Sequence, residues 1–130
     1  MIILTIRTDN PAAEIGLYDN AQQLAYEVWE AHRQLAETIH AKIYDLLQKQ
    51  HKDWHDIEAL VAYQGPGSFT GLRIGLTVAN ALAQSLEIPL VATQEPDWIE
   101  VGRARLLRGE DDRVAVPYYG APVHITPQKR

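Results

Sequence analysis

Cysteine is absent from this sequence of 130 residues, and methionine and phenylalanine each occur only once. Without cysteine no disulfide can form, and both zinc–thiolate sites and thiol nucleophiles are excluded. A chain of this length buries roughly two-thirds of the surface that it exposes when unfolded, so one domain can form its core without cross-links. The absence of cysteine also fits a reducing compartment.

Long hydrophobic runs and a surplus of positive charge are absent as well. No apolar run approaches the roughly 18 residues that would span a bilayer, and no basic leader precedes the short apolar run at residues 2–6. The 17 acidic residues outnumber the 12 basic ones, which gives a net charge of −5. Independent binding of nucleic acid normally needs a basic face. We therefore expect a soluble cytoplasmic protein without membrane contact, which meets RNA only inside a larger assembly.

The order of the apolar patterns predicts an α/β fold. Because strand-helix-strand crossovers are right-handed, the pattern predicts a five-stranded mixed sheet of order 3-2-1-4-5 with flanking helices. The predicted elements are strands at 2–6, 13–18 and 24–29, a helix at about 31–50, a strand at 58–64, a helix that ends near Leu86, a strand at 90–93 and a short helix at 98–107.

The end of the chain is less regular. Residues 114–119 favour an edge strand, because Pro117 cannot donate to a ladder of hydrogen bonds. Residues 120–130 carry two further prolines and favour an extended tail. The sequence therefore predicts a single lobe at 1–113, followed by an edge strand and C-terminal tail at 114–130.

A glycine-rich loop gives the strongest local signal. It reads Gly65-Pro66-Gly67-Ser68-Phe69-Thr70-Gly71-Leu72-Arg73 and leads into the second long helix. Backbone N–H groups at such a helix start attract anions, but the loop lacks the Walker A lysine and misses the dinucleotide spacing. An autonomous nucleotide-binding or hydrolytic protein that uses this loop remains an alternative. Ser68 suits a helix cap better than a nucleophile, because an elbow would need glycines at Pro66 and Thr70.

The second long helix carries a flank without bulky side chains. Gly71, Gly75, Ala79 and Ala83 recur every four residues and so line one side of the helix. Two glycines inside a helix cost about 1 kcal/mol each relative to alanine, which implies a close contact in return. Either the chain's own sheet or helix covers this flank, or a second molecule does. We expect a second molecule.

Together these residues resemble the TsaB (YeaZ) family over about residues 1–100. The likeness rests on the first strand and meander, the helix around 35–47, Asp56-Ile57-Glu58-Ala59 before a strand, the glycine loop through Gly75, and Pro89-Leu90-Val91. The resemblance implies a ribonuclease H-like lobe of the actin-like and Hsp70-like superfamily. It also implies a non-catalytic scaffold subunit of the bacterial machinery that forms N6-threonylcarbamoyladenosine at position 37 of tRNAs reading codons that begin with A.

The family's partners follow from the same resemblance. Its catalytic, metal-binding subunit is the paralogue TsaD, and the ATPase TsaE joins the pair, so a TsaD-like subunit is the expected heterodimer partner. In isolation the chain is expected to form a homodimer through the same flank. The implied contact residues are Ile39, Ile43, Gly71, Leu72, Gly75, Ala79 and Ala83. Neither a cofactor nor a metal is expected, because Glu95 and Ile99 stand where sibling enzymes place metal histidines.

The first turn departs from the family pattern. Members usually open it with Asp-Thr-Ser, whereas this chain has Arg7-Thr8-Asp9. A cation in place of the acid argues against metal–phosphate chemistry at this turn. Few residues follow the last matched strand, so we also expect a short form that lacks most of the family's second lobe.

Overall fold

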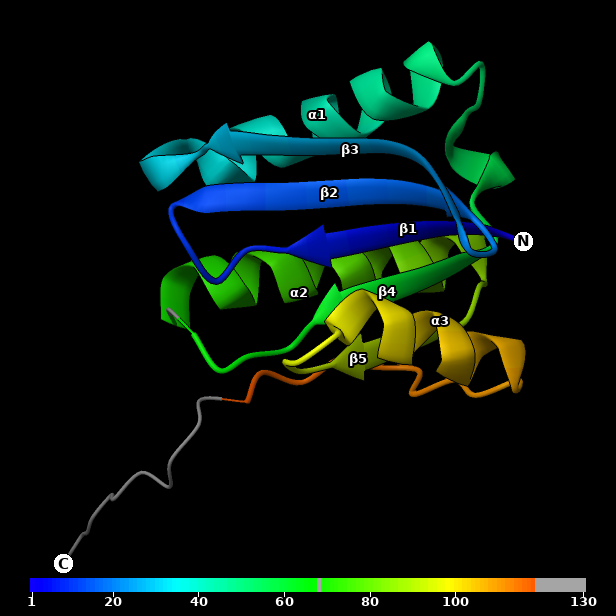
Figure 1. Cartoon of the computed structure of the whole chain (residues 1–130). Helices are drawn as coiled ribbons and strands as arrows, with labels where there is room; N and C mark the ends of the chain where they lie inside the picture. The colour runs from blue at the N-terminus through cyan, green and yellow to red at the C-terminus, as the bar shows by residue number, and fades with distance from the viewer. Residues whose placement is uncertain (68, 119–130) are drawn as a thin grey trace, which may run out of the picture.

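One sheet with helices on both faces makes up the described part of the chain (Figure 1). The computed structural model describes residues 1–67 and 69–118, without the side chains of His32 and Phe69. In chain order the elements are β1 (Ile2–Arg7), β2 (Ala12–Asp19), β3 (Gln22–Glu30), the 3-10 turn η1 (His32–Gln34), α1 (Leu35–Lys49), the 3-10 turn η2 (Trp54–Asp56), β4 (Ala59–Tyr63), α2 (Phe69–Leu86), β5 (Leu90–Thr93) and α3 (Trp98–Leu107). α1 and α2 cover one face of the sheet, and α3 covers part of the other (Figure 1).

The strand order is β3-β2-β1-β4-β5, which confirms the predicted order. β1 lies in the middle, antiparallel to β2 and parallel to β4, so that Thr5 is opposite Gly16 on one side and Val61 on the other. β4 pairs in parallel with β5. A strand covered on both faces can be apolar throughout, which explains why Ile3 and Leu4 are both fully buried although they point to opposite faces.

α1 packs one apolar stripe against the sheet. Its buried side chains are Leu35, Ile39, Ile43, Leu46 and Leu47. This is the three- and four-residue spacing of an amphipathic helix, as the sequence predicts. The helix begins later than predicted, because residues 32–34 first form the 3-10 turn, and the side chain of the N-cap residue Gln34 makes no capping hydrogen bond.

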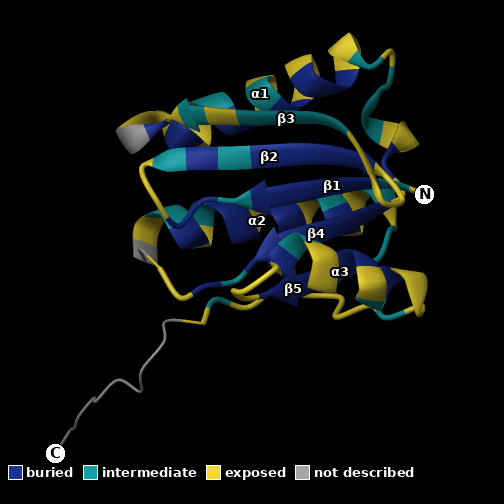
Figure 2. Cartoon of the chain, viewed as in Figure 1, coloured by how far each residue is buried: buried dark blue, intermediate teal, exposed yellow. Residues whose placement is uncertain are grey.

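Burial is deepest in the parallel half of the sheet (Figure 2). Every residue of β4 and β5 is buried, whereas the outer strand β3 contains exposed and half-buried residues only. The core therefore extends over β1, β2, β4 and β5 and the helices that cover them. Within residues 1–67 and 69–118, none of the helices combines the length and the apolar composition that a bilayer crossing requires.

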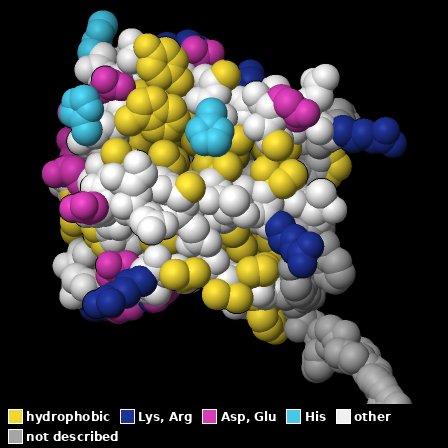
Figure 3. Space-filling view, turned by 180° about the vertical axis from the view of Figure 1, so that it is seen from behind, with side chains coloured by type: hydrophobic (Ala, Val, Ile, Leu, Met, Phe, Trp, Pro, Cys, Tyr) yellow, Lys and Arg dark blue, Asp and Glu magenta, His cyan; other side chains and the backbone are white. Residues whose placement is uncertain are grey.

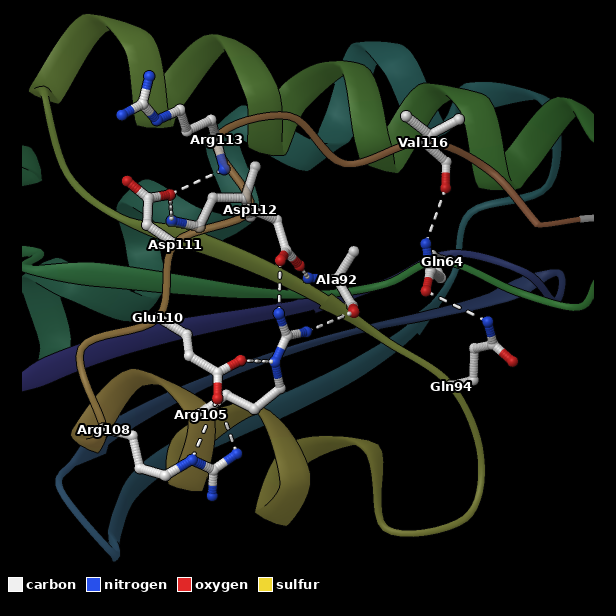
Figure 4. A network of polar contacts seen from close by, with 11 residues as sticks. Gln64, Ala92, Gln94, Arg105, Arg108, Glu110, Asp111, Asp112, Arg113 and Val116 are labelled. Carbon is white, nitrogen blue, oxygen red and sulfur yellow. Dashed lines mark hydrogen bonds and ion pairs between the residues drawn. The ribbon is translucent and has the colours of Figure 1, made fainter.

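Residues 110–118, which we call the C-terminal strap, run back along the open edge of β5 and then past α2 (Figure 4). The Asp112 N–H donates to the Leu90 carbonyl at 2.8 Å, and the Ala92 N–H donates to the Asp112 carboxylate at 2.8 Å. The strap therefore satisfies backbone groups that an edge strand would leave open.

Arg105 of α3 binds both the strap and β5 (Figure 4). Its guanidinium donates to the Glu110 carboxylate at 2.6 Å and to the Ala92 carbonyl at 3.1 Å, and it forms an ion pair with Asp112. One side chain thus joins α3, β5 and the strap.

Residues 114–118 do not form the edge strand that the sequence predicts at 114–119, and residue 119 lies outside the described residues. Residues 114–118 pair with no strand. The Asn80 side chain of α2 accepts the Ala115 N–H at 2.7 Å and donates to the Ala115 carbonyl at 3.0 Å, and Gln64 donates to the Val116 carbonyl at 2.9 Å. Side-chain amides here take the place of a neighbouring strand. The rest of the predicted tail lies outside the described residues.

The Arg105 network favours the ionised form of its acids. Burial alone would raise the pKa of Asp112, but hydrogen bonds from Arg105 and from the Ala92 N–H lower it overall. Hydrogen bonds from Arg105 and Arg108 lower the pKa of the exposed Glu110. Each acid therefore adds stability above its ordinary pKa of about 4, and that contribution is lost as the pH falls through the lowered value.

We expect Asp112→Asn to lower the free energy of unfolding at neutral pH, because the variant loses the ion pair with Arg105. The difference from the unmodified chain should shrink as the pH falls below the ordinary aspartate pKa of about 4 and through the lowered pKa of folded Asp112. Urea unfolding at a series of pH values measures this. Asp45→Asn, on the exposed side of α1, is the control. An Asp112→Asn deficit that is the same at every pH would contradict the electrostatic explanation.

Candidate functional site

Three turns meet at one edge of the sheet, beyond the carboxyl ends of β1, β4 and β5. These strands are mutually parallel, and ligand sites of α/β proteins gather at this edge. The β1–β2 turn contributes Thr8 and Asp9, the glycine loop follows β4, and the turn after β5 contributes Glu95.

Arg7 lies at the centre of this edge, in a group that we call the Arg7 cluster: Arg7, Asp9, Tyr63 and Glu95. The Arg7 guanidinium donates to both Asp9 carboxylate oxygens, at 2.7 and 3.2 Å, and it forms an ion pair with Glu95. Its central carbon lies 4.0 Å from the centroid of the Tyr63 ring, a cation–π contact. The Arg7 side chain is only 14% exposed and that of Asp9 only 7%, whereas that of Glu95 is 50% exposed.

Arg7 and Tyr63 each keep one protonation state near neutral pH. Burial alone would lower the pKa of Arg7, but hydrogen bonds to Asp9 and Glu95 raise it above its ordinary value. Burial raises the pKa of the Tyr63 hydroxyl, although the Arg7 charge opposes the change. A guanidinium that is always charged and a neutral phenol offer no group that titrates near neutral pH.

The glycine loop packs against the chain itself. Gly65 has φ 121°, and a Cβ there would lie less than 3.0 Å from the Tyr118 carbonyl oxygen of the strap. A Cβ at Gly67 would lie less than 3.0 Å from the Asp9 side chain. The Tyr63 hydroxyl donates to the Pro66 carbonyl at 2.9 Å. Glycine is therefore required here by neighbouring atoms of the same chain. The predicted cap Ser68 lies outside the described residues, as does the Phe69 side chain.

The flank of small residues on α2 faces the chain's own β1–β2 turn, which corrects the expectation that a second molecule covers it. A Cβ added at Gly71 or at Gly75 would lie less than 3.0 Å from Thr8. The Thr8 hydroxyl donates to the Gly71 carbonyl at 2.7 Å. Farther along the helix, Ala79 is fully buried and Ala83 is 5% exposed. The flank is bare because α2 must lie close to this turn and to the sheet.

The other predicted contact residues are buried too. The Ile39, Ile43 and Leu72 side chains are all fully buried in the core. A partner cannot reach these side chains while the chain is folded. They support the helices from inside, so these three members of the predicted interface set are not surface contacts, whereas Gly71 is half-buried and partly accessible.

The outward sides of α1 and α2 form a different surface. Between the two helices lies a groove of about 290 Å³, which we call the helix-pair groove. It is lined by Ala36, His40, Arg73, Ile74, Thr77 and Val78. Of the described loop residues, Pro66, Gly67, Thr70 and Arg73 are exposed, and of these only Arg73 lines this groove. Figure 3 shows the side of the molecule opposite to the view of Figure 1, where hydrophobic side chains and histidines gather.

A second hollow of about 500 Å³ continues along the same pair of helices toward the β1–β2 turn. Arg33, Leu35, Thr70 and Ile74 are among its lining residues. Ile74 lines both hollows, so the two are neighbours on one surface. Sequence periodicity could have placed Ala36, Thr77 and Ile74 off the buried stripe, but it could not show that they lie beside one another.

Comparison with known proteins gives consistent relatives. The family model described as "TsaD: tRNA N6-adenosine threonylcarbamoyltransferase" matches residues 29–99. The chain is 31% identical to the tRNA threonylcarbamoyladenosine biosynthesis protein TsaB of Escherichia coli (strain K12), over 92% of this chain and 54% of that protein. It is 34% identical to the protein of the same name from Bacillus subtilis (strain 168), over 71% of this chain and 40% of that protein.

Solved structures agree with the sequence relatives. YeaZ from Pseudomonas aeruginosa superposes with a TM-score of 0.65 and 29% identity, over 83% of this chain and 50% of that one. Thermus thermophilus RuvC in complex with a Holliday junction substrate has a TM-score of 0.53 at 16% identity, over 95% of this chain and 85% of that one, and supports the fold alone. The fold is therefore ribonuclease H-like, as expected. The chain spans about half the length of the curated TsaB proteins it matches.

We expect Gly75→Ala to destabilise the fold by about 1–3 kcal/mol, because the new methyl group overlaps Thr8. Removing the Thr8 hydroxyl and methyl groups relieves part of that overlap, so Gly75→Ala combined with Thr8→Ala should cost less than the sum of the two single changes. Chemical denaturation of the four chains of this cycle measures the coupling. Ser85→Ala, at an exposed position of α2, is the control. Strict additivity would show that Thr8 does not limit the approach of α2.

Proposed function

We propose that this chain, which belongs to the TsaB (YeaZ) family, is a non-catalytic cytoplasmic subunit of the bacterial complex that forms N6-threonylcarbamoyladenosine in tRNA. Its partner is a TsaD-like subunit, and tRNA is reached only through the complex. A TsaE-like ATPase is a further partner of the assembly.

The helix-pair groove is the observation that carries this proposal. Its floor contains Ile74, which is half-buried, and Val78, whose side chain is almost covered. Ala36 and Thr77 are small and exposed, so they leave room for ridges of another helix. An apolar centre with polar groups around it is the usual composition of a protein–protein interface. Arg73 and His40 supply polar groups on this surface.

The contact therefore uses the outward sides of α1 and α2, not the buried flank of α2. The small residues Gly71 and Gly75 act indirectly, since they fix α2 against the β1–β2 turn. A helix held in this way presents its outward side in a defined orientation. In isolation the same outward surface can pair with a second copy of the chain, because a two-fold contact between identical surfaces is self-complementary.

The rival hypothesis, an autonomous nucleotide-binding protein, has less support from the geometry. Phosphate binding requires free backbone donors and a positive environment, but Gly67 packs against the acidic side chain of Asp9. The guanidinium of Arg7 is already bound to two carboxylates. Calorimetry of the isolated chain with ATP and Mg²⁺ separates the two hypotheses, and micromolar binding would favour the rival.

We expect Ala36→Arg to prevent co-purification with the cognate TsaD-like subunit, because a long charged side chain would occupy the helix-pair groove. Ala104→Arg is the matched control: it places the same side chain at an exposed alanine of α3, on the opposite face of the sheet. Both variants should keep the circular dichroism spectrum of the unmodified chain. A stoichiometric complex with Ala36→Arg would exclude the groove as the contact.

In cells, depletion of this chain should lower the N6-threonylcarbamoyladenosine content of tRNA, as measured by mass spectrometry of digested nucleosides. Re-expression of the unmodified chain or of Ala104→Arg should restore the nucleoside, whereas Ala36→Arg should not. An unchanged nucleoside content after depletion would contradict the proposed role, even if the two subunits bind each other.

A further inference from the structure

The Arg7 cluster joins three segments that are distant in sequence. Asp9 comes from the β1–β2 turn and Glu95 from the turn after β5, and Arg7 and Glu95 are separated by 88 positions. The Tyr63 ring at the end of β4 forms a third wall, 4.0 Å from the guanidinium carbon. A positive charge therefore lies between two carboxylates at the edge of the sheet where α/β proteins place their ligands.

This arrangement differs from a cluster of acids on a surface, because a cation is already present in it. Asp9 is 7% exposed, and a buried carboxylate needs a positive partner or strong donors to remain ionised. Arg7 meets this need with two hydrogen bonds to Asp9. Among the described residues, no group of three or more histidines and acids is placed to hold a metal ion. Both carboxylates of the cluster thus pair with a cation that belongs to the chain itself.

We propose that Arg7 is a tethered cation, whose guanidinium occupies the position that a divalent metal ion would take between Asp9 and Glu95. The unmodified chain is then closed to Mg²⁺ and Mn²⁺ at this edge, and shortening the Arg7 side chain opens the site to them. The residues of this chain therefore do not fit a metal at this edge while Arg7 is in place.

The chemistry of the opened site supports the inference. Hard divalent cations bind one or two carboxylates and complete their coordination with water. Removal of the guanidinium leaves Asp9 with a buried and uncompensated charge, which is strongly unfavourable unless a cation or a proton replaces it. Glu95 is half exposed, so its carboxylate can adjust to a smaller ion while Asp9 stays fixed against Gly67.

Arg105 supplies a matched comparison within the same chain. It too contacts two carboxylates, those of Glu110 and Asp112. These acids have other donors, however: Arg108 binds Glu110, and the Ala92 N–H binds Asp112. Loss of Arg105 therefore leaves neither carboxylate without a partner. If the tethered-cation inference is right, only the loss of Arg7 creates a metal site.

The experiment uses the full chain and MnCl₂ as the probe, with the thermal midpoint and the Mn²⁺ electron paramagnetic resonance signal as readouts. Arg7→Gln removes the charge, Arg7→Lys keeps a cation, and Arg105→Gln is the control. We expect Mn²⁺ to raise the midpoint of Arg7→Gln by roughly 3–6 °C when free metal is about tenfold above its dissociation constant. The unmodified chain, Arg7→Lys and Arg105→Gln should not respond, and adding Asp9→Asn to Arg7→Gln should abolish the response.

Each of the following results would overturn the inference. The first is saturable Mn²⁺ binding by the unmodified chain, and the second is an equal response of Arg105→Gln, which would indicate non-specific binding to acids. The third is a folded Arg7→Gln chain whose thermal midpoint does not change when Mn²⁺ is added. If Arg7→Gln does not fold without metal, Mn²⁺ is expected to restore its circular dichroism spectrum, and failure to restore it also counts against the inference.

Discussion

The close approach of α2 to Thr8 is the constraint on which the rest of the structure depends. Gly71 and Gly75 have no room for a Cβ beside Thr8, and the Thr8 hydroxyl bonds to the Gly71 carbonyl. Two glycines inside a helix reduce its intrinsic stability by about 1 kcal/mol each, so a more favourable packing must offset them. Because α2 is fixed against the β1–β2 turn, the glycine loop at its start is brought against Asp9.

The sheet could be predicted from the sequence because its determinants are local. The uniform apolar run of β1 indicates a central strand, and right-handed crossovers then fix the strand order. The edge strand predicted at 114–119 was wrong for a different reason. Its backbone groups bond to the side chains of Asn80 and Gln64, which lie 35 and 52 residues away from the groups that they bind. No periodicity within the segment reveals such partners.

The candidate site was predictable only in part. The spacing of Gly71, Gly75, Ala79 and Ala83 correctly indicates a close contact, but a bare flank carries no information about which molecule covers it. Here the chain itself covers it. Likewise, the positions of Asp9 and Glu95 after parallel strands place both at one edge of the sheet. Their pairing through Arg7 depends on side-chain directions, which the sequence pattern does not encode.

The contrast between the carboxyl edge of the sheet and the helix-pair groove supports the proposed contact. At the carboxyl edge of the sheet Arg7 pairs with Asp9 and Glu95, and atoms of the same chain occupy the space beside Gly65 and Gly67. A ligand there would have to break these contacts before it gained its own. Within residues 1–67 and 69–118 no segment outside α1 and α2 is among the residues that line the helix-pair groove, and its half-buried Ile74 would lose water contact if a partner helix bound there. Binding of a partner at the helical face would therefore be more favourable than binding at the carboxyl edge of the sheet, where ligand sites of α/β proteins usually lie.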